Sequence, residues 1–523
     1  MNMPAFPTVA SIERVKVPFL TSGTALVCYV ALARLILYAL AGSQYGYFRD
    51  ELYYLACGEH PAWGYVDQPP LIGWMAWFLQ HTLGTSIWVL RLLPALAGAA
   101  TAIVAGLLAR EFGGRRWAMF LASVSTVLVP VALELTHLFT MNAFDPLLWT
   151  CIAFLIVRIS KTGNQRLWIA VGAIAGITIL NKYAVVFWLC GLLIGVLMTP
   201  LRRSLGQRWI SFGTAAAAAI ALPNFLWQWQ HQFPFLELMA NVRQSGRDIS
   251  LPPLSYLQAQ AEMLGNVAPV LAILALVFFF SKRGRPFRSL GWAYLVFLAL
   301  MLALRGKMYY VAPVYPMMFA AGAAWMESAS RQRFWSWSMP ALILAVIASG
   351  AIYAPTVLPI LSVPSYLAYE ERTGITQQKF ENQLQGVLPQ LYADMFGWQE
   401  IAETVGAYYR TLSPEEQKKT AIFANNFGEG GAIDFFGPRY GLPKAIGNHQ
   451  NYWIWGPREY KGESLIVLGD GDVRNMQTKC ASYTTIGSAK HPRSRPDEWI
   501  PIYHCRGFKW NLNEIWPEMK RFN

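Results

Sequence analysis

The sequence predicts an α-helical polytopic membrane protein of about eleven spans, followed by a small soluble α/β domain. Only 14% of the 523 residues are charged, whereas a soluble domain averages about a quarter. The shortage falls on residues 17–360, which are apolar runs broken by short basic clusters, while 362–523 has the composition of a water-soluble domain. We therefore divide the chain into a transmembrane part, 1–361, and a C-terminal domain, 362–523.

Each candidate span is close to the length that a bilayer requires. The spans are 18–41, 88–109, 117–134, 143–159, 167–181, 183–200, 209–227, 265–281, 289–304, 308–326 and 337–360. Basic loops, such as 110–116 and 282–288, fall on the same side as Arg14 and Lys16. The positive-inside rule makes that side cytoplasmic. We expect a multi-pass protein of the inner (plasma) membrane, with a cytoplasmic N-terminus and a C-terminal domain that is periplasmic or extracellular.

The net charge of +13 does not indicate a nucleic-acid partner. Most Lys and Arg residues lie in short loops between apolar runs, where they orient the spans. Nothing in the chain resembles a nucleic-acid-binding module. The sequence therefore predicts the lipid bilayer as a partner, and no nucleic acid.

The first outer loop, residues 42–87, is unusually long and acidic at its start. The stretch "DELYYLACGE", which carries Asp50 and Glu51, fits a short amphipathic helix. "LIGWMAWFLQHTLG" is too short to span comfortably and fits a helix lying in the membrane interface. Between them, Pro69 and Pro70 restrict the backbone and hold Asp67 in a defined place.

Further charges collect at the same outer face. Charges at membrane depth are costly, so they usually face a cavity and pair with another group. Any one of these residues is most simply explained as a charged loop residue exposed to solvent. So many charges at one face are better explained by a shared cavity. These residues include Asp145, Lys182, His231, Arg243, Arg247, Arg305 and Lys307.

The C-terminal domain shows alternating strand and helix patterns, which are typical of a small α/β fold. "TAIFAN", "SLIVLG", "SYTTIG" and "WIPIYHC" predict strands, while 394–411 and "GEGGAIDFFG" predict helices. Cys480 and Cys505 are the only cysteines in this domain. Because the domain is expected on the oxidising side of the membrane, they are candidates for a disulfide.

Three motifs, taken in order, carry a resemblance to a known family. They are Asp50-Glu51, "VDQPPL" and "RGKMYYVAPVYP" (Arg305–Pro316), with weaker matches around Asp145 and Lys182. Together they resemble the polyprenyl-phosphate-dependent glycosyltransferases of superfamily C, in the bacterial branch related to protein mannosyltransferases and the lipid A aminoarabinose transferase. The resemblance implies an inverting membrane glycosyltransferase that moves a hexosyl or pentosyl group from a polyprenyl-phosphate donor. It implies an envelope lipid, glycan or protein as the acceptor, on the outer face of the membrane.

The resemblance also implies roles for individual residues. Asp50 matches the catalytic base, and Glu51 is either its partner or a brace for the loop helix. Asp67 and Asp145 match acidic positions that position the acceptor. The departing phosphate needs cations, for which the candidates are Lys182, Arg243, Arg247, Arg305 and Lys307, with Tyr309. Gln68 stands where some relatives have a lysine, so that phosphate contact is either absent or supplied by another residue.

A divalent metal is the one cofactor that the resemblance suggests. Asp67 and His231 have suitable ligand chemistry. The sequence shows no tight His/Asp spacing, so a structural histidine near an interfacial tryptophan is the alternative interpretation of His231.

Two other functions fit a polytopic protein with outer charges. A transporter or flippase of lipid-linked or small substrates would more often show repeated halves and charges in the middle of its spans. A non-catalytic scaffold with the same fold is the second alternative. Replacing Asp50 and assaying sugar transfer discriminates among the three.

Overall fold

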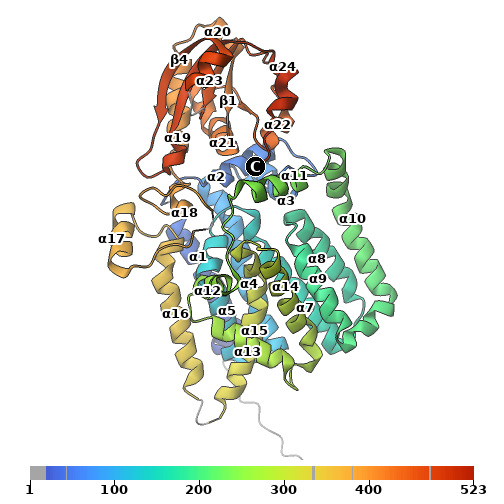
Figure 1. Ribbon diagram of the computed structural model, residues 1–523. Coiled ribbons are helices and arrows are strands. Elements are labelled where there is room, and N and C mark those ends of the chain that lie inside the picture. Colours follow the sequence, from blue (N-terminus) through green and yellow to red (C-terminus); the bar gives the residue numbers. More distant parts are fainter. Residues whose placement is uncertain (1–18, 43, 333–335, 380, 470–472) are drawn as a thin grey trace, which may run out of the picture.

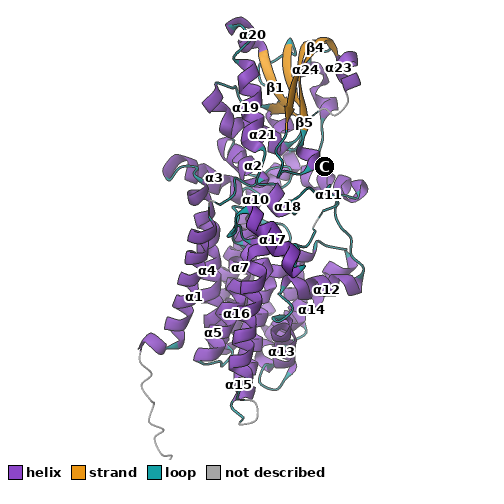
Figure 2. Ribbon diagram, turned by 90° about the vertical axis from the view of Figure 1, so that its left-hand side faces the viewer, coloured by secondary structure: helices purple, strands orange, loops and turns teal. Residues whose placement is uncertain are grey.

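The computed structural model describes residues 19–42, 44–332, 336–379, 381–469 and 473–523. The long helices of the first part run roughly parallel and form one elongated body (Figure 1). Three helices, α2 (Arg49–Glu59), α3 (Leu71–Thr82) and α11 (Pro234–Ser245), lie across its upper end, and the C-terminal part stands on that end (Figure 1). A view turned by 90° shows the same arrangement, with the strands confined to the C-terminal part (Figure 2). Arg14 and Lys16, which the predicted orientation uses, lie outside the described residues.

Sixteen α-helices build the described portion of the first part. They are α1 (Gly23–Ala41), α2 (Arg49–Glu59), α3 (Leu71–Thr82), α4 (Ile87–Glu111), α5 (Arg116–Leu128), α6 (Pro130–Leu135), α7 (Asp145–Thr162), α8 (Leu167–Asn181), α9 (Val185–Leu197), α10 (Arg208–Gln230), α11 (Pro234–Ser245), α12 (Pro253–Met263), α13 (Pro269–Phe280), α14 (Arg288–Ala303), α15 (Tyr315–Ser330) and α16 (Ser338–Val357). Every predicted span contains one of these helices. Among the described residues, six helices are long and apolar enough to cross a membrane. The protein is thus a multi-pass membrane protein, and the number eleven stays a prediction.

Prolines explain where predicted spans are interrupted. The span 117–134 is divided into α5 and α6, because Pro130 has no backbone N–H to continue the helix and Val129 before it is extended. The span 308–326 begins with a 3₁₀ turn, Met308–Val314, which contains Pro313. The two spans that meet at Asn181 are separated by an extended Lys182.

Both helices predicted in the first outer loop are present, as α2 and α3. Helix α2 begins at Arg49, where the Glu51 carboxylate accepts the backbone N–H of Phe48 at 2.9 Å. Helix α3 begins directly after the Pro69-Pro70 pair, as expected for a residue pair that fixes its own backbone angles.

The C-terminal part has eight α-helices and five strands in its described residues. They are α17 (Val363–Thr373), α18 (Gln390–Ala393), α19 (Trp398–Tyr409), α20 (Pro414–Lys419), α21 (Phe427–Phe436), α22 (Asn451–Trp455), α23 (Val473–Lys479), α24 (Leu512–Ile515), β1 (Thr420–Ala424), β2 (Ile446–Gly447), β3 (Ser464–Leu468), β4 (Cys480–Ala489) and β5 (Ile500–Phe508). The strand order is β2-β1-β3-β5-β4. Strand β1 pairs in parallel with β2 and β3, while β5 is antiparallel to β3 and β4. This confirms the predicted α/β domain, whereas its boundary at residue 362 stays a prediction.

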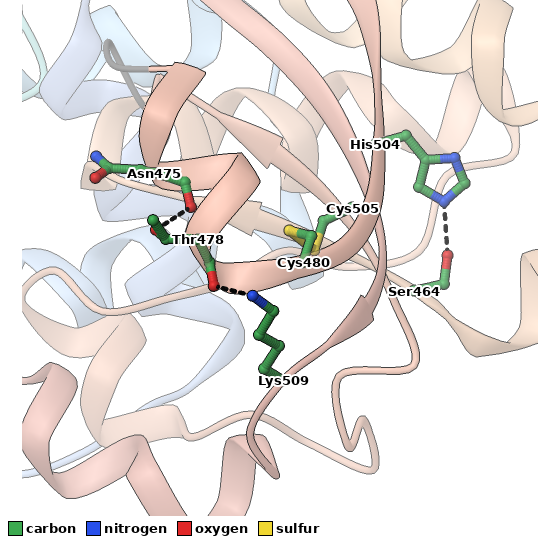
Figure 3. The surroundings of a disulfide bond; sticks show 7 residues. All are labelled: Ser464, Asn475, Thr478, Cys480, His504, Cys505 and Lys509. Atoms are coloured by element: carbon green, nitrogen blue, oxygen red, sulfur yellow. Dashed lines mark hydrogen bonds between the residues drawn. A yellow bond between two sulfur atoms is a disulfide. The ribbon is translucent and has the colours of Figure 1, made fainter.

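The predicted disulfide is present. It joins Cys480, the first residue of β4, to Cys505 in β5 (Figure 3). Next to Cys505, His504 is hydrogen-bonded to Ser464 of β3 at 2.7 Å. These contacts tie the antiparallel half of the sheet to its centre.

The first outer loop and the C-terminal domain share one hydrophobic core. Leu52 and Tyr53 of α2 pack with Ala432 and Ile433 of α21, and all four are buried. Gly431 permits this approach, because a Cβ at that position would lie 2.9 Å from the backbone of Leu52. Helix α2 is therefore held in place by its packing against α21 of the C-terminal domain.

Candidate active site

The structure brings several of the predicted site residues to one cavity of about 130 Å³, which we call the chamber. Asp50 comes from the start of α2, while Lys307 and Tyr309 follow α14. The other charged residues of its lining are Arg49, Glu134 and Glu381. The chamber thus holds a carboxylate from the first outer loop and a cation from a much later segment, as the motifs predicted.

Asp50 is the acidic group of α2 that faces the chamber. Its side chain is 29% exposed, and its Oδ1 lies 3.2 Å from the Arg49 Nε. Burial raises the pKa of Asp50 above its ordinary value, and the neighbouring Arg49 guanidinium opposes that shift. Arg49 is itself positioned by stacking over Phe427 of α21, at 5.2 Å from the ring centre. The acid at the expected base position is therefore partly exposed, next to one cation.

Of the two roles expected for Glu51, partner of Asp50 or brace for the loop helix, its contacts fit the brace. It is fully buried, and Arg91 of α4 binds both of its oxygens at 3.0 and 3.1 Å. The backbone N–H groups of Phe48 and Phe139 donate to the same carboxylate. With four hydrogen bonds and no face on the chamber, Glu51 braces the loop and is not placed among the reacting groups.

Asp67 lies outside the chamber lining. Its Oδ1 accepts a hydrogen bond from the Tyr53 hydroxyl at 2.9 Å, and Asn451 of α22 lies 3.5 Å away. Burial raises the pKa of Asp67 to about 7. The adjacent Gln68 is buried and points to the Cys57 sulfur at 3.5 Å. The "VDQPPL" motif therefore joins the loop to the C-terminal domain, and Gln68 does not supply the phosphate contact.

The residues proposed for a metal do not form a ligand set. His231 is exposed, stacks on Trp227 and contacts the Trp227 carbonyl at 2.8 Å. Within the described residues, no group of three or more His, Cys, Asp and Glu side chains is arranged to hold a metal ion. Because Asp67 is already held by Tyr53 and His231 is engaged elsewhere, we derive no step through a metal.

Lys182 lies next to the chamber, over the ring of the lining residue Tyr309. Its Nζ lies 2.5 Å from Asn142 Oδ1 and stands over the rings of Tyr309 and Tyr310, at 4.9 and 4.4 Å from their centres. Asp145 is buried at the start of α7 and accepts a hydrogen bond from Asn181 at 2.8 Å. Asp145 thus fixes the turn that carries Lys182, and it does not line the chamber.

Lys307 and Arg247 converge on one carboxylate, that of Glu381. The Glu381 Oε1 lies 2.9 Å from Arg247 and 3.3 Å from Lys307, and Lys307 is also 2.9 Å from Asp248. Burial acts to raise the pKa of Glu381, but the two cations hold it well below its usual range. The anion that these cations bind is therefore supplied by the protein itself.

Arg243 and Arg305 do not join this cluster. Both are exposed, and neither lines the chamber. Helix α11 ends at Ser245, and Gly246 takes the left-handed conformation, so Arg247 lies beyond the helix and does not share a face with Arg243. Arg305 also has a positive φ, of 53°. The prediction that these two arginines bind the donor phosphate receives no support from their positions.

Sequence reasoning missed Arg91, Glu381 and Glu134. Arg91 lies within an apolar helix, where its pairing with Glu51 has no local signal. Glu381 and Glu134 belong to segments that meet the chamber only after folding. An acid in an apolar stretch was the one available hint for Glu134.

Three comparisons show which known proteins this chain resembles. The family model for dolichyl-phosphate-mannose-protein mannosyltransferase matches residues 67–227. The lipid A galacturonosyltransferase RgtD of Rhizobium johnstonii is 30% identical over 189 residues, which are 35% of this chain and 39% of that protein. The chain therefore matches about two fifths of the length of that relative.

Two crystal structures share the fold. ArnT from Cupriavidus metallidurans bound to undecaprenyl phosphate superposes with a TM-score of 0.58 at 14% identity, over 92% of this chain and 98% of that one. The apo form of the same protein gives a TM-score of 0.57. The comparisons confirm the resemblance to polyprenyl-phosphate-dependent glycosyltransferases that the motifs predicted.

Proposed function

We propose, from its resemblance to the polyprenyl-phosphate-dependent glycosyltransferases of superfamily C, that this protein is a membrane glycosyltransferase. It moves a sugar from a polyprenyl-phosphate donor to a hydroxyl of an envelope lipid, glycan or protein, at the outer face of the membrane. The observation that carries the proposal is the joint lining of the chamber by Asp50 and Lys307. A base and a phosphate-binding cation in one site are what this transfer requires.

The proposed reaction is a single displacement with inversion. Asp50 accepts the proton of the acceptor hydroxyl as its oxygen forms a bond to the anomeric carbon of the sugar. The bond from that carbon to the donor phosphate oxygen breaks, and polyprenyl phosphate leaves with the electron pair. The charge that develops on the phosphate is stabilised by Lys307, with Arg247 and Lys182 around it. Tyr309, which lines the chamber under Lys182, positions that lysine.

Glu381 supports the assignment of Lys307 and Arg247 to the phosphate. Its carboxylate accepts from both cations, as an oxygen of a phosphate would. When the donor binds, its phosphate either replaces Glu381 or shares the two cations with it. Glu381 thus marks the position that we assign to the donor phosphate.

The relatives suggest the chemical class of both substrates. ArnT has been crystallised bound to undecaprenyl phosphate, and we assign a polyprenyl phosphate carrier to this chain by analogy. RgtD is a lipid A galacturonosyltransferase, so lipid A is the first acceptor to test. The loop charges support an orientation with the N-terminus cytoplasmic and the C-terminal domain outside.

The proposal is tested by reconstituting the protein in liposomes with a polyprenyl-phosphate sugar and lipid A. Transfer is measured as sugar on the acceptor together with released polyprenyl phosphate. Asp50→Asn should lose at least about a hundredfold in rate, because the amide cannot take a proton. Glu415→Gln changes an exposed acid of α20 and serves as the control. Full activity of Asp50→Asn would contradict the proposal.

A further inference from the structure

A second cavity, of about 330 Å³, shares a lining residue with the chamber. The shared residue is Glu134 of α6. We call this second space the side cavity, and its other polar lining includes Glu262, Tyr353, Gln377 and Gln378. It lies between the ends of α12 and α16 and the segment that follows α17. The two cavities therefore adjoin at Glu134.

The charge of the side cavity differs from that of the chamber. None of its lining residues, all in the described part of the chain, is Lys or Arg, while Glu134 and Glu262 are both acidic. The chamber in contrast has Arg49 and Lys307 in its wall. A phosphate would find no cation among the described residues that line the side cavity, whereas the chamber offers Arg49 and Lys307.

Polar atoms of the side cavity are buried without a partner. Gln377 Nε2, a donor, and Gln378 Oε1, an acceptor, make no hydrogen bond within the described chain. The other end of the Gln378 amide is used, since its Nε2 donates to Glu262 at 2.6 Å. Leaving such a buried group unpaired costs about 1–3 kcal/mol. These two atoms are therefore free of protein partners in the described chain and available to a polar molecule that enters the cavity.

The Glu134 carboxylate adds a third open position. Within the described residues no hydrogen bond or ion pair reaches it, although Glu134 is half-buried. A carboxylate can accept several hydrogen bonds, and an amide offers one donor and one acceptor group. A sugar hydroxyl donates one hydrogen bond and accepts others. The set of Glu134, Gln377 and Gln378 therefore fits the hydroxyl groups of a neutral sugar.

We propose that the side cavity binds a neutral sugar of the acceptor, with Glu134 as the residue that positions its hydroxyls. Gln377 and Gln378 complete the contacts, and the reacting hydroxyl extends into the chamber to meet Asp50. That the bound sugar belongs to the acceptor rests on the proposed function. The sugar-binding site itself does not, because it follows from the unpaired groups and the lack of cations among the described lining residues.

Photolabelling tests the site directly. The probes are an alkyl glucoside and an alkyl phosphate, each with a diazirine next to the head group, added to the protein in phospholipid nanodiscs. Mass spectrometry then locates the labelled peptides. We expect the glucoside to label the peptide that contains residues 374–378, and the phosphate to label peptides of the chamber. Glu134→Ala should reduce glucoside labelling by about threefold to tenfold, which is the effect of losing one hydrogen bond.

A second variant and a control keep the experiment decisive. Ile375→Trp fills the side cavity from a half-buried loop position and should reduce glucoside labelling even if Glu134→Ala does not fold. Glu371→Ala, an exposed neighbour outside the lining, should leave labelling unchanged. Unchanged labelling in both folded variants, or equal labelling of the 374–378 peptide by the phosphate, would overturn the inference.

The labelling experiment and the sugar-transfer assay test the two proposals independently of each other. The glucoside label requires no catalysis, so a protein that labels as expected but transfers no sugar disproves the proposed function and leaves the binding site standing. A protein that transfers sugar while both variants label like the parent disproves the side cavity and leaves the function standing.

Discussion

Asp50 and Lys307 line the same chamber, although one belongs to the first outer loop and the other follows α14. Neither motif alone defines a site, since an acidic pair and a basic-Tyr motif are both common in loops. Their meeting gives each a complementary partner: an acid that can take a proton and a cation that can hold a leaving phosphate. Changes to either residue, or to the contacts that hold it, should therefore have separable effects.

Lys307 is expected to stabilise the leaving phosphate. Lys307→Ala should lower kcat/KM by about a hundredfold to a thousandfold, as does loss of one charged or polar group that stabilises a transition state. Lys307→Arg should restore part of the rate, because the charge is kept. Steady-state kinetics with the lipid-linked donor measures both. The control is Lys509→Ala, an exposed lysine of the C-terminal domain, and equal rates for the Lys307 and Lys509 variants would exclude the assignment.

Glu381 is expected to compete with the donor. Glu381→Gln removes the negative charge from Lys307 and Arg247 while keeping the shape of the side chain. Binding of undecaprenyl phosphate should become about threefold to tenfold tighter, since the two cations lose this internal anion. Titration by microscale thermophoresis measures the Kd, with Glu371→Gln as the control. Weaker binding would instead show that Glu381 holds the cations in place for the donor.

The pH dependence of transfer should follow Asp50. A base must be deprotonated, and burial raises the pKa of Asp50, so kcat/KM should rise with pH. The midpoint of this limb should lie above the ordinary aspartate value of about 3.9. A pH–rate profile measures it, and the residual rate of Asp50→Asn should show no such limb. A limb that persists unchanged in Asp50→Asn would assign the base to another residue.

Asp67 should make stability depend on pH. Its folded pKa of about 7 lies above that of the unfolded chain, so the folded state binds the proton more tightly. The contribution to stability is complete below the unfolded pKa of about 3.9 and is lost as the pH rises through about 7. Asp67→Asn should therefore raise the melting temperature more at pH 8 than at pH 5. Equal shifts at the two pH values would refute a raised pKa.

Arg91 should be essential to the fold around α2. Arg91→Ala leaves Glu51 buried without its charge partner, which costs about 3–5 kcal/mol. Replacing both residues, as Arg91→Met with Glu51→Gln, should recover much of the loss because no unpaired charge remains. Thermal unfolding in detergent measures this, with Arg116→Ala, an exposed arginine, as the control. If Arg91→Ala were as stable as Arg116→Ala, the bracing role would be disproved.

Much of the fold could be predicted because its signals are local. The apolar runs indicated the helices of the membrane part, and "TAIFAN" and "SLIVLG" indicated two strands at the centre of the sheet. Prolines divided spans that hydropathy alone joined, as at Pro130. The span count could not be fixed, because several helices, such as α13, are shorter than a bilayer requires.

The site was predicted only in part, for a physical reason. Asp50 and Lys307 belong to recognisable motifs, so both could be named from the sequence. Arg305 stands two residues before Lys307 and looks equivalent in sequence, but a turn with positive φ sends the chain in another direction. The pairing of Glu381 with Arg247 joins segments far apart in the chain, and no local pattern encodes that contact.

The burial of α2 beneath α21 has a consequence for how small a working version of this protein can be made. Helix α2 carries Asp50, and its apolar side is covered by residues that come near the end of the chain. Shortening the protein to its membrane helices would strip that cover and expose Leu52 and Tyr53 to water. The C-terminal domain is then required to keep α2 folded, and the proposed transfer activity should be lost when it is removed.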